Sequence, residues 1–404
     1  MKILLVHQNF PGQFRGLAPA LLAAGHDLRA ISMKAQTNPL GVPHWRYQPQ
    51  RPSSPDIHPW LVNTETAVLR GQAVAQVVQD MASQAWVPDL VLGHTGWGEM
   101  LFMREAAPQA RLLGFNELYY RTEGGDVGFD PEFPSAPDQM KRLQVRNMHL
   151  LSSLLNCDVA ITPTHWQASC FPPALRDRLR VIHDGIHTDT LKPNRSVSIQ
   201  LGRDRLRLGW GDEIVTFVNR NLEPMRGYHQ FMRALPDILA KRPRARAVIV
   251  GGDEVSYGAV PSGHKGYKSI YLDEVRDRLD MSRVHFVSRV PYTTLIDLLR
   301  ISAAHVYLTV PFVLSWSMLE AMSVGALVIG SDTAPVREVI EHERNGLLVD
   351  FFKPEQIAQT VCEALAHPER FMHLREAARA TVVQRYDFHT HALPQYMALI
   401  EGSS

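Results

Sequence analysis

The sequence predicts an α/β protein with two doubly wound, Rossmann-like domains whose sheets face each other across a cleft. Short aliphatic and β-branched runs alternate with amphipathic helical stretches, which is the pattern of βαβ units and of parallel sheets buried on both faces. The alternation is interrupted once, over residues 188–203, and then restarts. A length of 404 residues is sufficient for two domains, each with its own core.

The first domain is expected over residues 1–187. Its predicted elements are, in order, a strand at 2–7, a helix at 15–24, strands at 27–33 and 90–93, a strand at 111–115 and a strand at 159–162, with long helices at 64–84 and 139–156. The carboxyl ends of parallel strands lie at one edge of a sheet, so a ligand is expected at the loops that follow these strands.

The second domain is expected over residues 204–385, after a linker at 188–203. The linker interpretation rests on Pro193, Asn194 and the lack of periodicity in this stretch. Six apolar runs then predict the strands of a second parallel sheet, at 213–218, 247–250, 284–286, 305–309, 326–329 and 347–349.

The composition limits the classes of partner. Lys plus Arg (42) nearly equals Asp plus Glu (41), so nucleic acid is not an expected partner, and any anionic ligand must be bound by local groups. The balance likewise provides no field to attract an anionic membrane. Peripheral membrane contact stays open among the partners, and the oligomeric state is not specified. Three cysteines without metal-ligand spacing fit a reducing compartment. No apolar run is long enough for a signal peptide or a span, so a cytoplasmic protein is expected.

The stretch 305–330 has the clearest functional pattern, because it predicts a strand, a loop, a short helix and a second strand. Ser315 or Ser317 can cap the helix, and Gly325 ends it. The free amides and the positive dipole end of such a helix form a site for a phosphate or diphosphate. Glu320 lies one turn into the helix and is suited to the hydroxyls of a ribose. The alternative is that Glu320 only complements the helix dipole.

These residues resemble the family 4 glycosyltransferases of the GT-B fold. The family has two glutamates eight positions apart, the second followed by Ala-Met and later by Gly and an aliphatic strand; Glu320, Ala321, Met322 and Gly325 match the second half. Phe312 stands where the first glutamate would be. The resemblance implies that Glu320 binds the nucleotide ribose. It also implies that the donor site includes Phe312, Ser315, Trp316, Ser317 and Met318.

The resemblance extends over nearly the whole chain and implies further site residues. Arg220 and Arg226 resemble the basic pair that the family places at the donor diphosphate, and a guanidinium fork suits that charge. A solvated basic face is the alternative for these arginines. Val290 lies where the backbone of the family contacts the base. Residues 386–404 are expected to pack back on the first domain, as in relatives.

In the first domain, four residues are predicted to lie on the acceptor side of the cleft or beside the transferred sugar. Gly12 resembles the glycine loop of the family, although a plain turn fits equally. His94 follows an apolar strand and, by the resemblance, bonds the transferred sugar; a structural histidine is the alternative. Asn116 and Glu117 follow the next strand and suit the hydroxyls of an acceptor.

The sequence therefore predicts a hexosyltransferase-like enzyme that moves a sugar from a nucleotide-sugar donor to a hydroxyl of a carbohydrate, lipid-linked or other acceptor. His94, Arg220 and Arg226 are the predicted catalytic groups. No Asp-x-Asp triplet, paired-cysteine ligand set, P-loop or dinucleotide fingerprint is present, so no metal or cofactor is expected. The resemblance implies retention of configuration. A catalytically idle nucleotide-sugar-binding partner and a sugar-nucleotide 2-epimerase are the alternatives.

Overall fold

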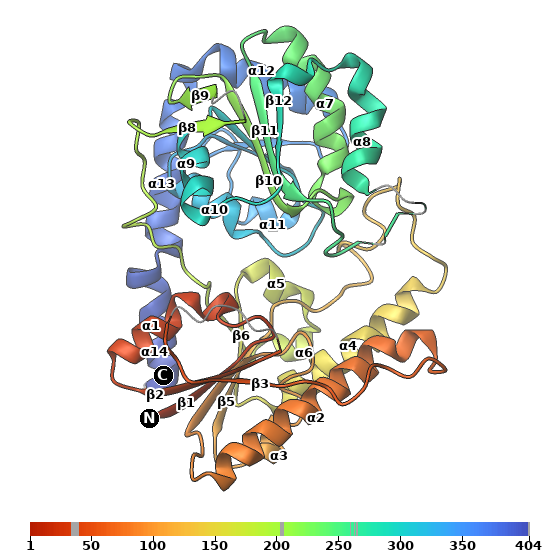
Figure 1. The fold of residues 1–404 in the computed structure, drawn as a ribbon, viewed down its shortest axis with the longest axis vertical. Coiled ribbons are helices and arrows are strands. Elements are labelled where there is room, and N and C mark those ends of the chain that lie inside the picture. Colours follow the sequence, from red (N-terminus) through yellow and green to blue (C-terminus); the bar gives the residue numbers. More distant parts are fainter. Residues whose placement is uncertain (34–39, 203–205, 259, 262, 264–265, 403–404) are drawn as a thin grey trace. The chain divides into compact units, whose positions relative to one another are not determined.

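A computed structural model of the chain describes residues 1–33, 40–202, 206–258, 260–261, 263 and 266–402. The chain divides into two compact units, each with its own parallel sheet (Figure 1). The first unit is Met1–Gly185 together with Phe388–Ser404, and the second is Ile186–Asp387. The predicted class, two Rossmann-like α/β domains, is confirmed.

The sheet of the first unit has seven strands in the order β3-β2-β1-β4-β5-β6-β7, and every pair is parallel. The strands are β1 (Lys2–Val6), β2 (Asp27–Ser32), β3 (His44–Arg46), β4 (Leu90–His94), β5 (Arg111–Phe115), β6 (Val159–Thr162) and β7 (Leu179–Val181). The short edge strand β3 was not predicted, because three residues offer too little periodicity to detect.

Alternate side chains of these strands pack against helices on both faces. Ile3 and Leu5 of β1 join the cluster formed with α1 (Leu17–Ala23) and α14 (Leu393–Glu401), whereas Leu4 and Val6 join the cluster formed with α2 (Val62–Ser83). The helices of the unit are α1 (Leu17–Ala23), α2 (Val62–Ser83), α3 (Met103–Ala106), α4 (Gln139–Asn156), α5 (His165–Cys170), α6 (Pro173–Arg176) and α14 (Leu393–Glu401). The last of these shows that the end of the chain is part of the first unit.

The second unit has a six-stranded parallel sheet in the order β12-β11-β10-β13-β14-β15. Its strands are β10 (Ile214–Asn221), β11 (Arg246–Gly252), β12 (Val284–Val287), β13 (Ala304–Tyr307), β14 (Val328–Ser331) and β15 (Leu347–Val349). Its helices are α7 (Tyr228–Lys241), α8 (Tyr267–Val275), α9 (Tyr292–Ile301), α10 (Trp316–Ser323), α11 (Ala334–Arg337), α12 (Pro354–Ala366) and α13 (Met372–Tyr386).

The segment that was expected to be a linker, 188–203, is structured over its described residues. It contains β8 (Ser198–Leu201), which pairs antiparallel with β9 (Leu206–Gly209). The Arg379 guanidinium donates to the carbonyls of Thr188 and Leu191, which fixes the start of the segment to α13. These contacts come from residues far away in the sequence, so composition alone could not reveal them.

None of the helices in the described parts of the chain is both long and apolar enough to cross a membrane.

Candidate active site

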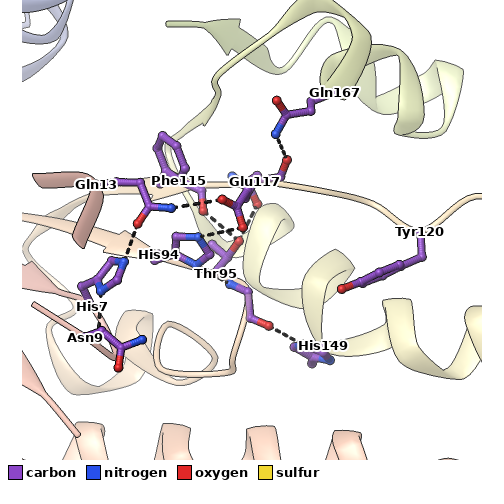
Figure 2. A network of polar contacts seen from close by, with 12 residues as sticks. His7, Asn9, Gln13, His94, Thr95, Phe115, Glu117, Tyr120, His149 and Gln167 are labelled. Atoms are coloured by element: carbon purple, nitrogen blue, oxygen red, sulfur yellow. Dashed lines mark hydrogen bonds and ion pairs between the residues drawn. The ribbon is translucent and has the colours of Figure 1, made fainter. Parts of the chain in front are cut away.

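Three polar side chains meet where strands of the first sheet end. His7 directly follows β1, His94 is the last residue of β4, and Glu117 lies two residues after β5 (Figure 2). The parallel register aligns Val6 with Gly93, and His94 with Phe115. The sheet therefore brings together residues that are more than a hundred positions apart.

A directional chain of hydrogen bonds connects His7 to Glu117. The backbone N–H of Asn9 donates to His7 Nδ1 over 2.9 Å, and His7 Nε2 lies 2.5 Å from Gln13 Oε1. Burial and the neighbouring His94 lower the pKa of His7 to about 3, so the ring is neutral near pH 7 and its one proton is on Nε2. Gln13 therefore accepts from His7 and donates from Nε2 to Glu117 Oε1 over 3.1 Å.

Gly12 allows this chain to form. Its φ of +47° lies in the left-handed region, and a Cβ at this position would be 2.2 Å from His7 Cε1. The sequence predicted that Gly12 lets the backbone approach a ligand. In the structure the group that approaches Gly12 is the His7 ring.

Two contacts fix the His94 ring, one from the Trp97 ring and one from the backbone of Gly96. It stacks on the Trp97 ring with 4.1 Å between centroids, and its Nδ1 accepts the N–H of Gly96 over 3.0 Å. Because Nδ1 accepts this hydrogen bond, the ring proton is on Nε2. This atom makes no hydrogen bond to any described residue and lies 3.7 Å from Glu117 Oε2, although the residue is only 1% exposed.

Glu117 is a carboxylate in this setting. Burial alone would raise its pKa, but the neighbouring rings of His94 and His7 and the Gln13 amide outweigh burial and lower the pKa. The side chain is partly exposed, and the backbone carbonyl accepts from the Gln167 amide. One carboxylate oxygen is thus bonded to Gln13, and the other faces His94.

Asn116, which was predicted to contact an acceptor, is 2% exposed. Its Oδ1 accepts from the Thr95 hydroxyl over 3.0 Å, and its Nδ2 donates to the Gly114 carbonyl over 2.7 Å. These bonds hold the ends of β4 and β5 together. The role that the structure displays for Asn116 is to support its neighbours.

In the second unit, α10 starts after the loop that follows β13, as the sequence predicts. The Ser315 hydroxyl caps the helix by accepting the N–H of Ser317 over 3.3 Å. Glu320 is 3% exposed, and its Oε1 accepts the Tyr292 hydroxyl over 2.7 Å. Met318 is fully buried against the core of the unit. The helix is therefore fixed in place by its apolar face, while its first turn and Glu320 lie at the sheet edge where β13 ends.

Arg226 and Phe312 form one cluster with a side chain that was not predicted. Arg226 is 4% exposed, and its Nη1 donates to the Thr309 hydroxyl over 2.8 Å and to the Val313 carbonyl over 2.9 Å. The rings of Phe312 and Tyr257 lie 5.4 and 5.3 Å from the guanidinium carbon. Arg226 thus holds the loop between β13 and α10.

Glu223 joins the same region from the start of the turn before Arg226. Its carboxylate is 1% exposed and accepts the backbone N–H groups of Ser256, Tyr257 and Gly258 over 3.2–3.3 Å. A buried carboxylate is stable only when it is bonded in this way. Glu223 therefore fixes the loop that carries Tyr257 against Arg226.

Two other predicted donor residues are placed differently. Arg220 is the second-last residue of strand β10 and is exposed, whereas Phe217 of the same strand is buried in the core. Val290 follows β12 by three residues and packs partly buried against the core. Arg220 is thus available to solvent, whereas Arg226 is already bonded within the protein.

Family models match both halves of the chain. The model described as "Glycosyl transferase family 4 group" matches residues 24–191, and the model described as "Glycosyl transferases group 1" matches residues 202–381. The chain belongs to glycosyltransferase family 4. The enzyme is accordingly a glycosyltransferase with the GT-B fold.

One relative matches nearly the whole enzyme, and another matches about half of it. It is 23% identical to the GDP-mannose-dependent alpha-(1-6)-phosphatidylinositol monomannoside mannosyltransferase of Mycobacterium tuberculosis, over 97% of this chain and 96% of the relative. It is 25% identical to the D-inositol 3-phosphate glycosyltransferase of Thermobispora bispora, over 54% of this chain and 51% of the relative.

Solved structures share the fold over full length. HepE of Anabaena, in complex with UDP and glucose, superposes with a TM-score of 0.70 at 18% identity, and sucrose-phosphate synthase of Thermosynechococcus elongatus with a TM-score of 0.71 at 18% identity. Both matches cover 100% of both chains.

Sequence reasoning missed several residues of these clusters: His7, Gln13, Trp97, Glu223, Tyr257 and Tyr292. His7 had a detectable signal, since it is a polar residue directly after a buried strand in the enzyme. For Gln13, Glu223, Tyr257 and Tyr292, the contacts join residues far apart in sequence, which no local pattern encodes. Trp97 contacts His94, which is close in sequence, but the stacking of two rings leaves no local sequence pattern.

Proposed function

We propose that the enzyme transfers a hexose from a nucleoside-diphosphate sugar to a hydroxyl of a carbohydrate or lipid-linked acceptor, with retention and without a metal, in glycan or glycoconjugate synthesis. The Mycobacterium tuberculosis relative is named as a GDP-mannose-dependent enzyme with a phosphatidylinositol mannoside acceptor, which supports a lipid-linked or polyol acceptor here. The complex of HepE with UDP and glucose supports a nucleoside-diphosphate donor.

The single observation that supports the donor assignment best is the buried Glu320 beside the capped start of α10. A carboxylate accepts several hydrogen bonds, so its bond from Tyr292 is compatible with bonds from the two hydroxyls of a ribose. The amide groups of the first turn and the helix dipole favour the adjacent diphosphate. Phe312, buried in this loop, offers the sugar an apolar surface in place of a carboxylate.

Transfer breaks the bond between the anomeric carbon of the sugar and the diphosphate oxygen, and forms a bond from that carbon to the acceptor oxygen. The proton of the acceptor hydroxyl passes to the departing diphosphate. Negative charge then grows on the departing nucleoside diphosphate. The first turn of α10 and the exposed guanidinium of Arg220 stabilise this charge, so that a metal is not needed for it. Arg226 contributes by holding the loop and by its positive charge.

In the first unit, His94 binds the transferred sugar through Nε2. This nitrogen has a proton to donate and no hydrogen bond to any described residue, whereas the other ring nitrogen is occupied by Gly96. A buried donor without a partner is unfavourable by about 1–3 kcal/mol, which a substrate oxygen recovers on binding.

The experiment is to incubate the protein with UDP-, GDP- and ADP-sugars and to measure nucleoside diphosphate release, with and without phosphatidylinositol mannoside or inositol 3-phosphate. We expect release that depends on an acceptor, persists in EDTA and falls at least 100-fold in His94→Ala. NMR of the product should show the anomeric configuration of the donor. Tight donor binding without turnover would identify the idle partner that Phe312 suggests, and product inverted at C2 would identify an epimerase.

A further inference from the structure

The end-of-strand cluster of the first unit presents one hydrogen-bond donor directly beside one acceptor. Because His94 Nδ1 accepts the Gly96 N–H, the free position of the ring is the Nε2 proton. Because Glu117 Oε1 accepts from Gln13, the oxygen that faces His94 is Oε2, which is an acceptor only. A hydroxyl is the group that both accepts and donates, so this pair is complementary to a hydroxyl.

The distance fits such a ligand. Nε2 and Oε2 are 3.7 Å apart, which is too long for a direct hydrogen bond between them. One hydroxyl oxygen can nevertheless lie about 2.8 Å from both atoms, within the normal range for hydrogen bonds. It would accept the His94 proton and donate its own proton to Glu117.

Glu117 is aimed by the residues behind it. The Asn9 amide fixes the tautomer of His7, His7 fixes which end of the Gln13 amide faces Glu117, and the Gln13 amide nitrogen binds Oε1 (Figure 2). Every group in this relay has one orientation that satisfies its neighbours. The carboxylate is therefore preorganised before any ligand arrives.

We infer that Glu117 and His94 together read one hydroxyl of the carbohydrate substrate, and that Gln13 and His7 are positioning residues that orient Glu117 for this task. The inference rests on the proposed function, because it requires a carbohydrate in the site. It assigns to Glu117 a specificity role for a hydroxyl. A substrate that lacks the hydroxyl leaves both the Nε2 proton and the Oε2 acceptor unpaired, which is how sites of this kind reject deoxy analogues.

The test compares wild type with Glu117→Ala, Gln13→Ala and the double variant, using the nucleotide sugar, UDP-glucose or GDP-mannose, that wild type consumes faster. The probes are deoxy analogues of this nucleotide sugar, which lack the hydroxyl at C3, C4 or C6 of the hexose. A second set of probes consists of acceptors that lack one hydroxyl at a time. In wild type, loss of one hydroxyl should lower kcat/KM at least 100-fold. In Glu117→Ala, loss of the same hydroxyl should lower kcat/KM less than about tenfold, because the carboxylate that binds this hydroxyl has been removed.

The hydroxyl can belong to the donor sugar or to the acceptor, and the rates of transfer and of donor hydrolysis distinguish these two cases. If the hydroxyl belongs to the donor sugar, Glu117→Ala lowers both transfer and the slow hydrolysis of the donor by water. If the hydroxyl belongs to the acceptor, only transfer falls. An unchanged deoxy penalty in Glu117→Ala overturns the inference, whereas a wild type that consumes no nucleotide sugar overturns the proposed function.

Two controls separate positioning from folding. Gln13→Ala should lower the transfer rate at least tenfold when Glu117 is present but less than twofold in the Glu117→Ala background. Equal losses in both backgrounds would contradict the inference that Gln13 acts by positioning Glu117. Glu105→Ala removes an exposed carboxylate of the same unit and should leave transfer unchanged.

Long-range proton–nitrogen NMR correlations should place the proton of His7 and of His94 on Nε2 without any substrate. A proton on Nδ1 of His94 would refute the assignment of Nε2 as the hydrogen-bond donor.

Discussion

Both units have a parallel sheet, but different side chains lie where the strands end: a hydrogen-bonding cluster in the first unit and a cationic cluster in the second. The first unit gathers two histidine rings, an amide and a carboxylate. Hydrogen bonds link His7, Gln13 and Glu117, and the Nε2 donor of His94 and the Oε2 acceptor of Glu117 remain for a ligand. The second unit gathers arginines, aromatic rings and a capped helix start, and its carboxylates Glu223 and Glu320 accept hydrogen bonds from their own unit.

The difference teaches how one fold divides two tasks. A sugar hydroxyl is neutral and directional, so it is recognised by a paired donor and acceptor in fixed positions. A diphosphate is a diffuse negative charge, so it is recognised by cations and helix amides. The fold supplies the strand ends, and the side chains placed there decide which ligand each unit takes.

The largest effect should come from removing the carboxylate of the first unit. Glu117→Ala is expected to lower transfer turnover about 100- to 1000-fold, as for loss of one preorganised group in an active site. The affinity for UDP or GDP alone should stay within twofold of wild type, since neither nucleotide carries the carbohydrate hydroxyl that we infer Glu117 binds. Steady-state kinetics and isothermal titration calorimetry measure the two quantities. Equal losses in both would break the division of tasks between the units.

The second effect concerns the glycine that makes room for His7. Gly12→Ala places a methyl group within 2.2 Å of the His7 ring at a positive φ. Gly25→Ala is the matched control, because its φ is +81° but no atom lies within 4 Å of the added Cβ. Both should lose about 1–2 kcal/mol from the left-handed backbone.

Overpacking should then destabilise Gly12→Ala by about 1–3 kcal/mol more and lower its turnover at least tenfold. Urea titration and turnover assays measure both variants. Equal behaviour of the two would show that the contact between Gly12 and His7 does not matter.

The smallest effect is the pH dependence that His7 contributes to the stability of the first unit. The pKa of His7 is about 3 in the folded protein, below the ordinary 6.5, so the unfolded chain binds the proton first. The contribution of His7 to stability is therefore complete above pH 6.5 and is lost as pH falls toward 3. Between pH 6.5 and pH 5 the loss is about 2 kcal/mol.

Hydrogen exchange of the β1 amides at these two pH values measures this loss. His7→Asn should lose about 2 kcal/mol less than wild type over the interval. An identical pH dependence in the two proteins would mean that His7 is not buried as a neutral ring.

The fold could be predicted from sequence wherever the signal was local. The helix at 139–156 was predicted at the bounds of α4, because its apolar period repeats over five turns. The pairing of β8 with β9 was missed, since each strand has four residues and β8 lies within 188–203, the stretch that was expected to be a linker. A short strand is stabilised by hydrogen bonds to the strand beside it, and a local sequence pattern does not show which strand that is.

The candidate site divides in the same way. Glu320 and Ser315 could be predicted, because a helix and its cap are encoded within a few residues. The relay from His7 through Gln13 to Glu117 could not, because it joins side chains 104 residues apart whose orientation depends on the sheet register. Glu223 and Tyr257 were missed for the same physical reason.

The most direct test of the division between the units is the affinity for a nucleoside diphosphate, measured by calorimetry with UDP and GDP on wild type, Glu117→Ala and Glu320→Ala. Glu320→Ala should weaken binding about 10- to 100-fold, which corresponds to the loss of charge-assisted bonds worth roughly 1.5–3 kcal/mol. Glu117→Ala should bind as wild type does. An unchanged affinity in Glu320→Ala, or a comparable loss in Glu117→Ala, would contradict the account.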